Sequence, residues 1–226
     1  MRFILLILFL FAALAKPCLA SEPSPDSNFV LEPSCTFTAK DGSFSIRQYH
    51  NPKDNWQIWM VPRHGAAYQL TDEDPVYPYR SGDDPGNWNL SPDSHWLART
   101  ERLGSGTYTL LLYHREGNQR FTQVSPGPLG DLACNFYEKH SGLTREQCLV
   151  DHPQSTFFKW VGSRYLVVAL SGESTMSTPM WATNNWLVEY DLKERRFFLT
   201  DDLIDKNQGR VYPVVQPVSE PLDTLR

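Results

Sequence analysis

Two long stretches combine aromatic side chains with carboxylates, amides and hydroxyls. Residues 72–89 read DEDPVYPYRSGDDPGNWN, and residues 171–185 read SGESTMSTPMWATNN. Aromatic rings can stack on a sugar while neighbouring polar groups bond its hydroxyls, and they can equally bind a peptide. The predicted ligand-binding residues are Tyr77, Tyr79, Trp88 and Trp181. The competing interpretation is that these rings fold back onto the core.

Cysteine and histidine residues cluster between 134 and 152. In an exported chain, Cys134 and Cys148 are expected to form a disulfide, worth roughly 3 kcal/mol for so short a loop. Free thiols are one alternative. Another is a zinc site completed by His140 and His152, although their order matches no zinc pattern that we can support. Cys35 could be buried or could replace one partner.

Two carboxylate pairs, Asp83-Asp84 and Asp201-Asp202, could serve acid–base chemistry or bind Ca²⁺. The simpler interpretation is that they are turn residues. A glycosidase would need two carboxyl groups facing each other roughly 5–9.5 Å apart. The segment nearest to a nucleophile elbow, residues 172–176, lacks the last glycine. The sequence contains no phosphate loop, zinc-protease motif or dinucleotide fingerprint, so we expect no cofactor, no metal and no catalytic residues.

The elements that would position these residues come from a pattern that occurs three times. The first halves read AKDGSFSI (39–46), SPDSHWLA (91–98) and WVGSRYLVV (160–168), and the second halves read IWMVPRHGAAYQLT (58–71), LLLYHREGNQRFT (110–122) and WLVEYDLKERRFFLT (186–200). Each unit predicts a turn, an aromatic-led strand and a hairpin. Phe44, Trp96 and Tyr165 share the position after the turn, which suits a half-buried strand. The units are expected to close at Leu70-Thr71, Phe121-Thr122 and Leu199-Thr200.

The second unit, WNLSPDSHWLARTE, resembles the SPDG signature of the WD-like, Tol-type β-propeller repeats of bacterial periplasmic proteins. It has Ser94 where that signature has glycine, whereas the first unit keeps only Asp41-Gly42 and the third loses the SPD. The resemblance covers most of residues 35–203. It implies an all-β fold, an antiparallel meander of three propeller-blade-like repeats. The family includes binding scaffolds and peptidase accessory domains, and fold alone does not fix function.

Three units are too few for a closed propeller, which typically has four to eight blades. An open set would expose two sheet edges, which proteins avoid. Three solutions stand open. Two chains could supply six blades as a homo-oligomer, residues 26–34 and 210–218 could add closing strands, or the units could fold into a sandwich.

Residues 128–153 form an insertion of a different kind. Asp131 can cap a short helix that runs to about His140, and Gly142 fits its C-terminal end. Thr144 and Gln147 form a capping-box signal for a second short helix, which Pro153 would end. The insertion therefore predicts a short helical hairpin.

The first 20 residues have the pattern of an export signal. Arg2 precedes an apolar run of 13 residues, too short to span a membrane, and Cys18 and Ala20 suit a signal peptidase, so we expect cleavage after Ala20. Residues 21–34 are then an N-terminal extended segment and 204–226 a C-terminal extended tail. We expect the protein in the periplasm or outside the cell, with no membrane span after cleavage.

Without the leader, 19 basic residues stand against 26 acidic ones. This balance argues against a nucleic acid or an anionic membrane as partner. The sequence favours an exported, non-enzymatic binding or scaffold protein with a protein or carbohydrate ligand. The alternatives are a secreted, glycan-directed hydrolase that uses loop carboxylates, and a structural subunit whose edges pair with copies of itself.

Overall fold

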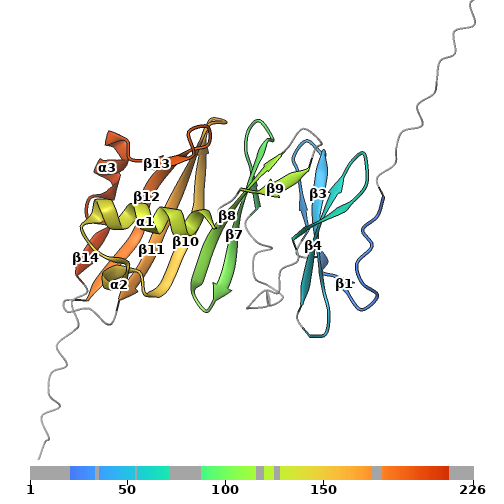
Figure 1. Cartoon of the computed structure of the whole chain (residues 1–226), viewed down its shortest axis with the longest axis horizontal. Coiled ribbons are helices and arrows are strands. Elements are labelled where there is room, and N and C mark those ends of the chain that lie inside the picture. The colour runs from blue at the N-terminus through green and yellow to red at the C-terminus, as the bar shows by residue number, and fades with distance from the viewer. Residues whose placement is uncertain are drawn as a thin grey trace, which may run out of the picture.

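The computed structural model describes residues 21–33, 36–53, 55–71, 88–115, 120–124, 128–174 and 180–213. These residues form a mostly β structure of two curled sheets (Figure 1). The five-stranded sheet contains β1 (Val30–Leu31), β2 (Phe37–Thr38), β3 (Phe44–His50), β4 (Trp56–Pro62) and β5 (Tyr68–Thr71). The nine-stranded sheet contains β6 (Trp88–Leu90), β7 (Trp96–Gly104), β8 (Thr107–Arg115), β9 (Phe121–Gln123), β10 (Asp151–Val161), β11 (Tyr165–Ser174), β12 (Trp181–Asp191), β13 (Arg196–Phe198) and β14 (Val211–Pro213).

The three sequence units have the same local hydrogen bonding. Each contains an antiparallel run of three strands, namely β3-β4-β5, β7-β8-β9 and β11-β12-β13. The predicted aromatic residues Phe44, Trp96 and Tyr165 each begin the first of these strands. The same backbone bond then closes each hairpin: Arg63 N to Ser43 O (2.8 Å), Arg115 N to His95 O (2.8 Å) and Leu192 N to Arg164 O (3.0 Å).

The units differ in how they end. Leu70 and Thr71 end β5, whereas Phe121 and Thr122 begin β9. Thr200 lies beyond β13 and caps α3 (Asp201–Asn207), accepting a hydrogen bond from Leu203 N at 3.3 Å. The expected common closing position is therefore wrong, because hydrophobic-Thr pairs occur at strand ends, strand starts and helix caps alike. The helix α3 was not predicted from the sequence, and its residues 204–207 were expected to be extended.

The sheets do not separate into one body per unit. The second and third units share the nine-stranded sheet, joined where β10 runs parallel to β8 with Gln154 opposite Tyr108. β1 pairs with β3 and β14 pairs with β12, so both terminal segments add strands, as one closure alternative expected. The propeller-like arrangement itself stays a prediction.

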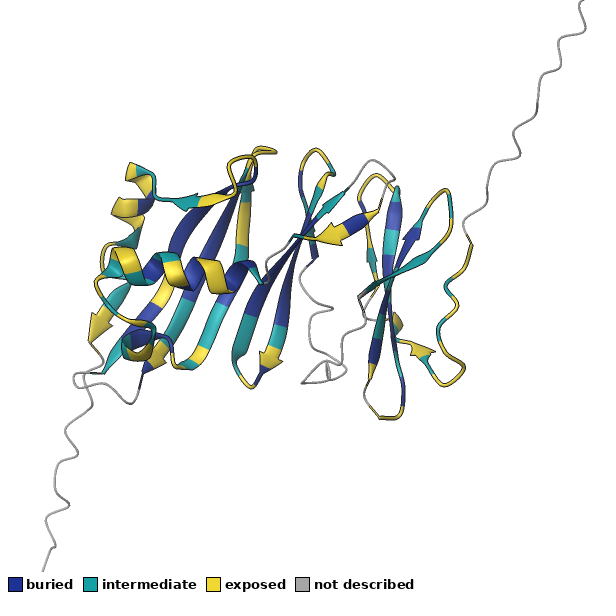
Figure 2. Cartoon of the chain, viewed as in Figure 1, coloured by how far each residue is buried: buried dark blue, intermediate teal, exposed yellow. Residues whose placement is uncertain are grey.

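Strands β7 and β8 are buried on both faces. Successive side chains of a strand point to opposite faces. Leu97 and Leu111 therefore pack with the five-stranded sheet, and Ala98 and Leu110 pack with α1 (Leu129–Ser141) and β11. A smaller cluster around Leu203 of α3 covers the other face of β11 and β12. Figure 2 shows the buried residues concentrated along the central strands.

The insertion forms the two predicted helices. Gly142 ends α1 in the left-handed conformation (φ 75°), and Thr144 and Gln147 form the capping box of α2 (Arg145–Cys148). Asp131 lies in the first turn of α1 and is not its cap, and Pro153 lies in β10 and does not end α2. α1 lies across one face of the nine-stranded sheet (Figure 1). No helix among the described residues is long and apolar enough to cross a bilayer.

The free edge of β12 is closed by residues from the C-terminal part of the chain. β13 pairs with one end of β12 and β14 with the other. Between them, the Asn207 side chain imitates a strand: Oδ1 accepts from Leu187 N and Nδ2 donates to Leu187 O, both at 2.7 Å. Arg210 also donates to the Asn185 carbonyl. This arrangement covers an edge that could otherwise pair with another chain.

Replacing Asn207 with alanine should leave the Leu187 amide and carbonyl without these partners. We expect Asn207→Ala to lower the free energy of unfolding by about 1–3 kcal/mol and to increase self-association. Urea denaturation and light scattering measure the two effects. Gln208→Ala is the matched control, because the Gln208 side chain donates to Asp205 only at a long 3.4 Å and its backbone bond to Asp205 O is kept in the variant. Equal stability of the two variants would contradict the role of the Asn207 side chain in closing the β12 edge.

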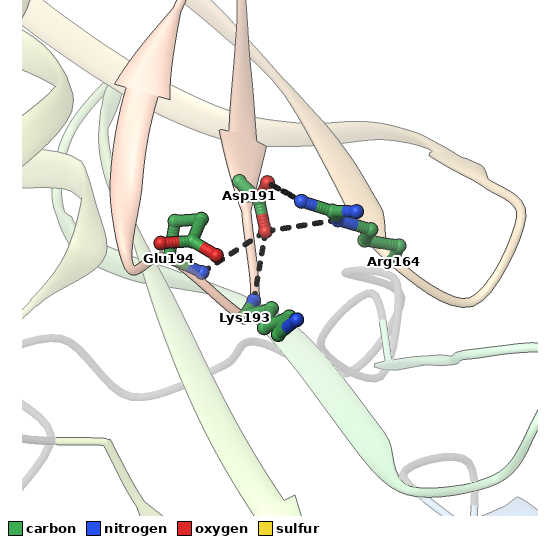
Figure 3. A network of polar contacts seen from close by, with 4 residues as sticks. All are labelled: Arg164, Asp191, Lys193 and Glu194. Carbon is green, nitrogen blue, oxygen red and sulfur yellow. Dashed lines mark hydrogen bonds and ion pairs between the residues drawn. The ribbon is translucent and has the colours of Figure 1, made fainter.

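The turn after β12 is organised by Asp191 (Figure 3). Its Oδ1 accepts from Lys193 N (2.9 Å) and Glu194 N (3.0 Å), and its Oδ2 accepts from Arg164 Nη2 (2.7 Å). The bond from Arg164, followed by the backbone amides, lowers the pKa of Asp191 to about 2. The carboxylate thus joins the β10–β11 turn to the β12–β13 turn.

A carboxyl group with a lowered folded pKa stabilises the fold above its ordinary pKa, and this contribution is lost as the pH falls. We therefore expect Asp191→Asn to lower Tm at pH 7. The difference from the unmodified protein should shrink as the pH falls from about 4 to about 2. Thermal denaturation at a series of pH values tests this, with Asp205→Asn as the control. A pH-independent difference would contradict the electrostatic role.

Candidate functional site

A pocket of about 520 Å³ lies where residues of the three sequence units meet. It is lined by Phe37, Lys40, Asp41, Trp88, Asn89, Leu90, Ser91, Pro92, Ser94 and Trp160. These residues come from β2 and the following turn, from β6 and the following turn, and from the end of β10.

Two equivalent turns form much of the pocket wall. In the first unit, Gly42 N donates to Ala39 O at 2.8 Å, and in the second Ser94 N donates to Ser91 O at 2.9 Å. Gly42 and Ser94 both have positive φ, of 65° and 60°. The similarity between the DG and SPDS motifs is therefore a similarity of turn geometry, in which Ser94 occupies a conformation that glycine adopts more readily.

Aspartate side chains stabilise these turns. Asp41 Oδ1 accepts from Ser43 N (2.9 Å), and Asp93 Oδ1 accepts from His95 N (3.2 Å). The bond from the Ser43 amide lowers the pKa of Asp41, so its carboxylate is charged at neutral pH. Ser91 Oγ donates to Asp93 (2.6 Å) and accepts from Trp96 N (2.9 Å). Both bonds of this hydroxyl therefore lie within the turn and stabilise it.

Trp88 belongs both to the pocket wall and to the core. Its residue is 6% exposed, and the Arg99 guanidinium carbon lies 5.1 Å from its ring centre. Arg99 is fully buried and its Nη2 lies 3.5 Å from a carboxylate oxygen of Glu101. Tyr113 packs on the same indole at 6.1 Å between ring centres. Cation–π and aromatic contacts therefore fix the orientation of this wall.

The predicted ligand residues do not converge on one site. Trp88 lines the pocket, whereas Trp181 begins β12 and packs against the large core cluster around α1. Tyr77 and Tyr79 lie outside the described residues. Sequence reasoning did not assign Phe37, Lys40 and Trp160 to a site. Lys40 and Trp160 stand in repeat units that were interpreted as scaffold, and the contacts of β10 with β7 and β8 that bring Trp160 near the other two units are not local in sequence.

The two described cysteines are free and buried, so the expected disulfide between Cys134 and Cys148 is not formed in the structure. Each thiol has its own surroundings. Cys134 lies beside Arg145 in a cavity of about 100 Å³. Cys148 Sγ donates to Thr144 O at 3.2 Å and lies near the Tyr137 hydroxyl. Cys35 lies outside the described residues.

The two histidines of the alternative zinc site contact different neighbours. His140 Nδ1 bonds the Phe136 carbonyl at 2.8 Å, and its ring stacks on Phe136. His152 Nδ1 lies 3.8 Å from a carboxylate oxygen of Glu173. Among the described residues, no group of three or more potential ligands could hold a metal ion.

Of the two carboxylate pairs, only Asp201-Asp202 lies among the described residues. Asp201 and Asp202 lie in the first turn of α3, where the helix dipole favours negative charge, and Asp202 pairs with Lys206 at 2.7 Å. Asp83 and Asp84 lie outside the described residues. Asp41 is the only carboxylate among the described residues that line the large pocket.

Searches against models of protein families, curated proteins and solved structures find no match to this chain. The resemblance to Tol-type repeats thus stays a prediction from sequence.

Burial raises the pKa of Cys134 to about 11 and also raises that of Cys148. Because the thiolate is the reactive form, we expect both thiols to react with iodoacetamide at pH 8 at least about tenfold more slowly in the folded protein than in urea. Peptide mapping after alkylation locates each label. If both remain unlabelled in urea until a reductant is added, a disulfide joins them and the free-thiol arrangement is wrong.

Proposed function

We propose that this chain is an exported, non-enzymatic binding protein whose ligand occupies the pocket between the three units. The observation that carries the proposal is the pocket itself, with apolar walls from Phe37, Leu90 and Trp160 beside polar groups of Asp41 and Asn89. Its volume of about 520 Å³ falls in the range of small-molecule sites. The leader supports export.

The chemistry of the lining favours a neutral saccharide. Indole and phenyl rings offer flat apolar surfaces, and an amide and a carboxylate can bond adjacent hydroxyls. Lys40 and Asp41 contribute opposite charges, so the described lining carries no net charge. A peptide that adds a strand needs free backbone groups. Here the Gly42 and Ser94 amides already bond within their turns.

The proposal is tested by titrating a panel of neutral mono- and disaccharides, and a parallel panel of short peptides, by saturation-transfer NMR and tryptophan fluorescence. We expect a saccharide to bind, and Trp160→Ala to weaken its affinity at least about tenfold through loss of stacking. Asp41→Asn should weaken binding through loss of a charged acceptor.

The matched control is Phe158→Ala. Phe158 lies on β10 near Trp160 but is 48% exposed and does not line the pocket. Circular dichroism confirms that each variant is folded. Binding of peptides alone would overturn the saccharide class. If Trp160→Ala leaves saccharide binding unchanged, the assignment of the binding site to this pocket is wrong.

A further inference from the structure

The first residues after the expected cleavage point lie against the five-stranded sheet. Residues 21–32, here called the N-terminal strap, run along the face of this sheet that points away from the nine-stranded sheet (dark blue in Figure 1). At one end of the strap, Val30 and Leu31 pair with β3 as β1, and Glu32 N donates to Gln48 O at 2.9 Å. The strap is therefore an ordered part of the fold.

Side chains of the sheet hold the middle of the strap. Arg47 of β3 donates to Glu22, and Gln57 of β4 donates to Asp26 at 3.2 Å. Arg47 lies opposite Trp59 in the pairing of β3 with β4, so it points away from the buried Ile46 and toward the strap side. The strap thus covers the second face of this sheet.

Ser21 forms the other end of the strap. Its backbone nitrogen donates to Gly65 O at 3.1 Å, and its hydroxyl accepts from Ala67 N at 3.0 Å. Both partners lie in the turn between β4 and β5. The residue that cleavage after Ala20 would expose is thus the residue that anchors the strap.

We infer that the Ser21 amine released by leader cleavage is a structural group, and that the Gly65–Ala67 turn is its binding site. This inference rests on the export part of the proposed function and does not depend on the pocket. Before cleavage the Ser21 nitrogen is a neutral amide with one proton to donate. After cleavage it is an ammonium group with three protons, and a charge-assisted hydrogen bond to Gly65 O is roughly twice as strong as a neutral one. Cleavage of the leader therefore strengthens the contact between the strap and the β4–β5 turn.

The experiment compares two forms of the chain that begin at Ser21, one with a free amine and one N-acetylated. Acetylation keeps one N–H for Gly65 O, as in the uncleaved chain, and removes the charge and the other two protons. Hydrogen exchange is measured at the Ala67 and Glu32 amides at pH 6.5, where an ordinary α-amine is charged. We expect exchange at Ala67 to be about tenfold slower with the free amine.

Two variants distinguish loss of the Ser21 contacts from a general effect of substitution in the strap. Ser21→Ala should speed exchange at Ala67 in both forms, because it removes the acceptor of that amide. Ser24→Ala is the control, since Ser24 is exposed and should leave exchange unchanged. Equal exchange in the free and acetylated forms would overturn the inference.

The N-terminus of the exported protein, determined by mass spectrometry, tests the processing step separately. A first residue other than Ser21 would overturn the role of cleavage even if Ala67 is protected in vitro. Failure of saccharide binding would overturn only the pocket, because neither the exchange measurement nor the N-terminus involves a ligand.

Discussion

The rest of this structure depends on the burial of β7 and β8 on both faces. Leu97, Leu111 and Tyr113 face the five-stranded sheet, and Ala98 and Leu112 face α1 and the third unit. Two cores therefore share one pair of strands. Each fully buried aliphatic side chain contributes roughly 1.5–3 kcal/mol, so a polar substitution here would weaken both cores together. The contact also fixes the distance between the first and third units, and the large pocket lies between them.

Local features were predictable because their causes are local. The turn before Phe44 and the left-handed Gly42 follow from a short motif, as do the Gly142 helix end and the Thr144–Gln147 capping box. The hairpins were predictable because short apolar runs and short polar turns occur within about 15 residues. Non-local features were missed. Nothing near Trp160 indicates that β10 lies parallel to β8, and this single pairing merges two units into one sheet.

The expected ligand residues show the same limit. Aromatic residues in a polar stretch are equally compatible with a binding loop and with a strand that enters the core. Trp88 satisfies both descriptions, because one part of it lines the pocket while Arg99 and Tyr113 pack on its ring. Trp181, at the start of β12, is partly buried against the core cluster around α1. The disulfide was inferred from compartment and spacing, whereas burial beside different partners is a property of the tertiary structure.

Both terminal segments complete sheets that the three units leave open. The strap covers a face of the five-stranded sheet and pairs with β3, while Asn207 and β14 close the edge of β12. Exposed edges and apolar faces favour association, so a chain with too few units for a closed ring needs such segments. Pairing of another chain with the β12 edge would then require displacement of Asn207 or of β14. The ends of the chain thus supply strand and side-chain partners that the three units do not supply themselves.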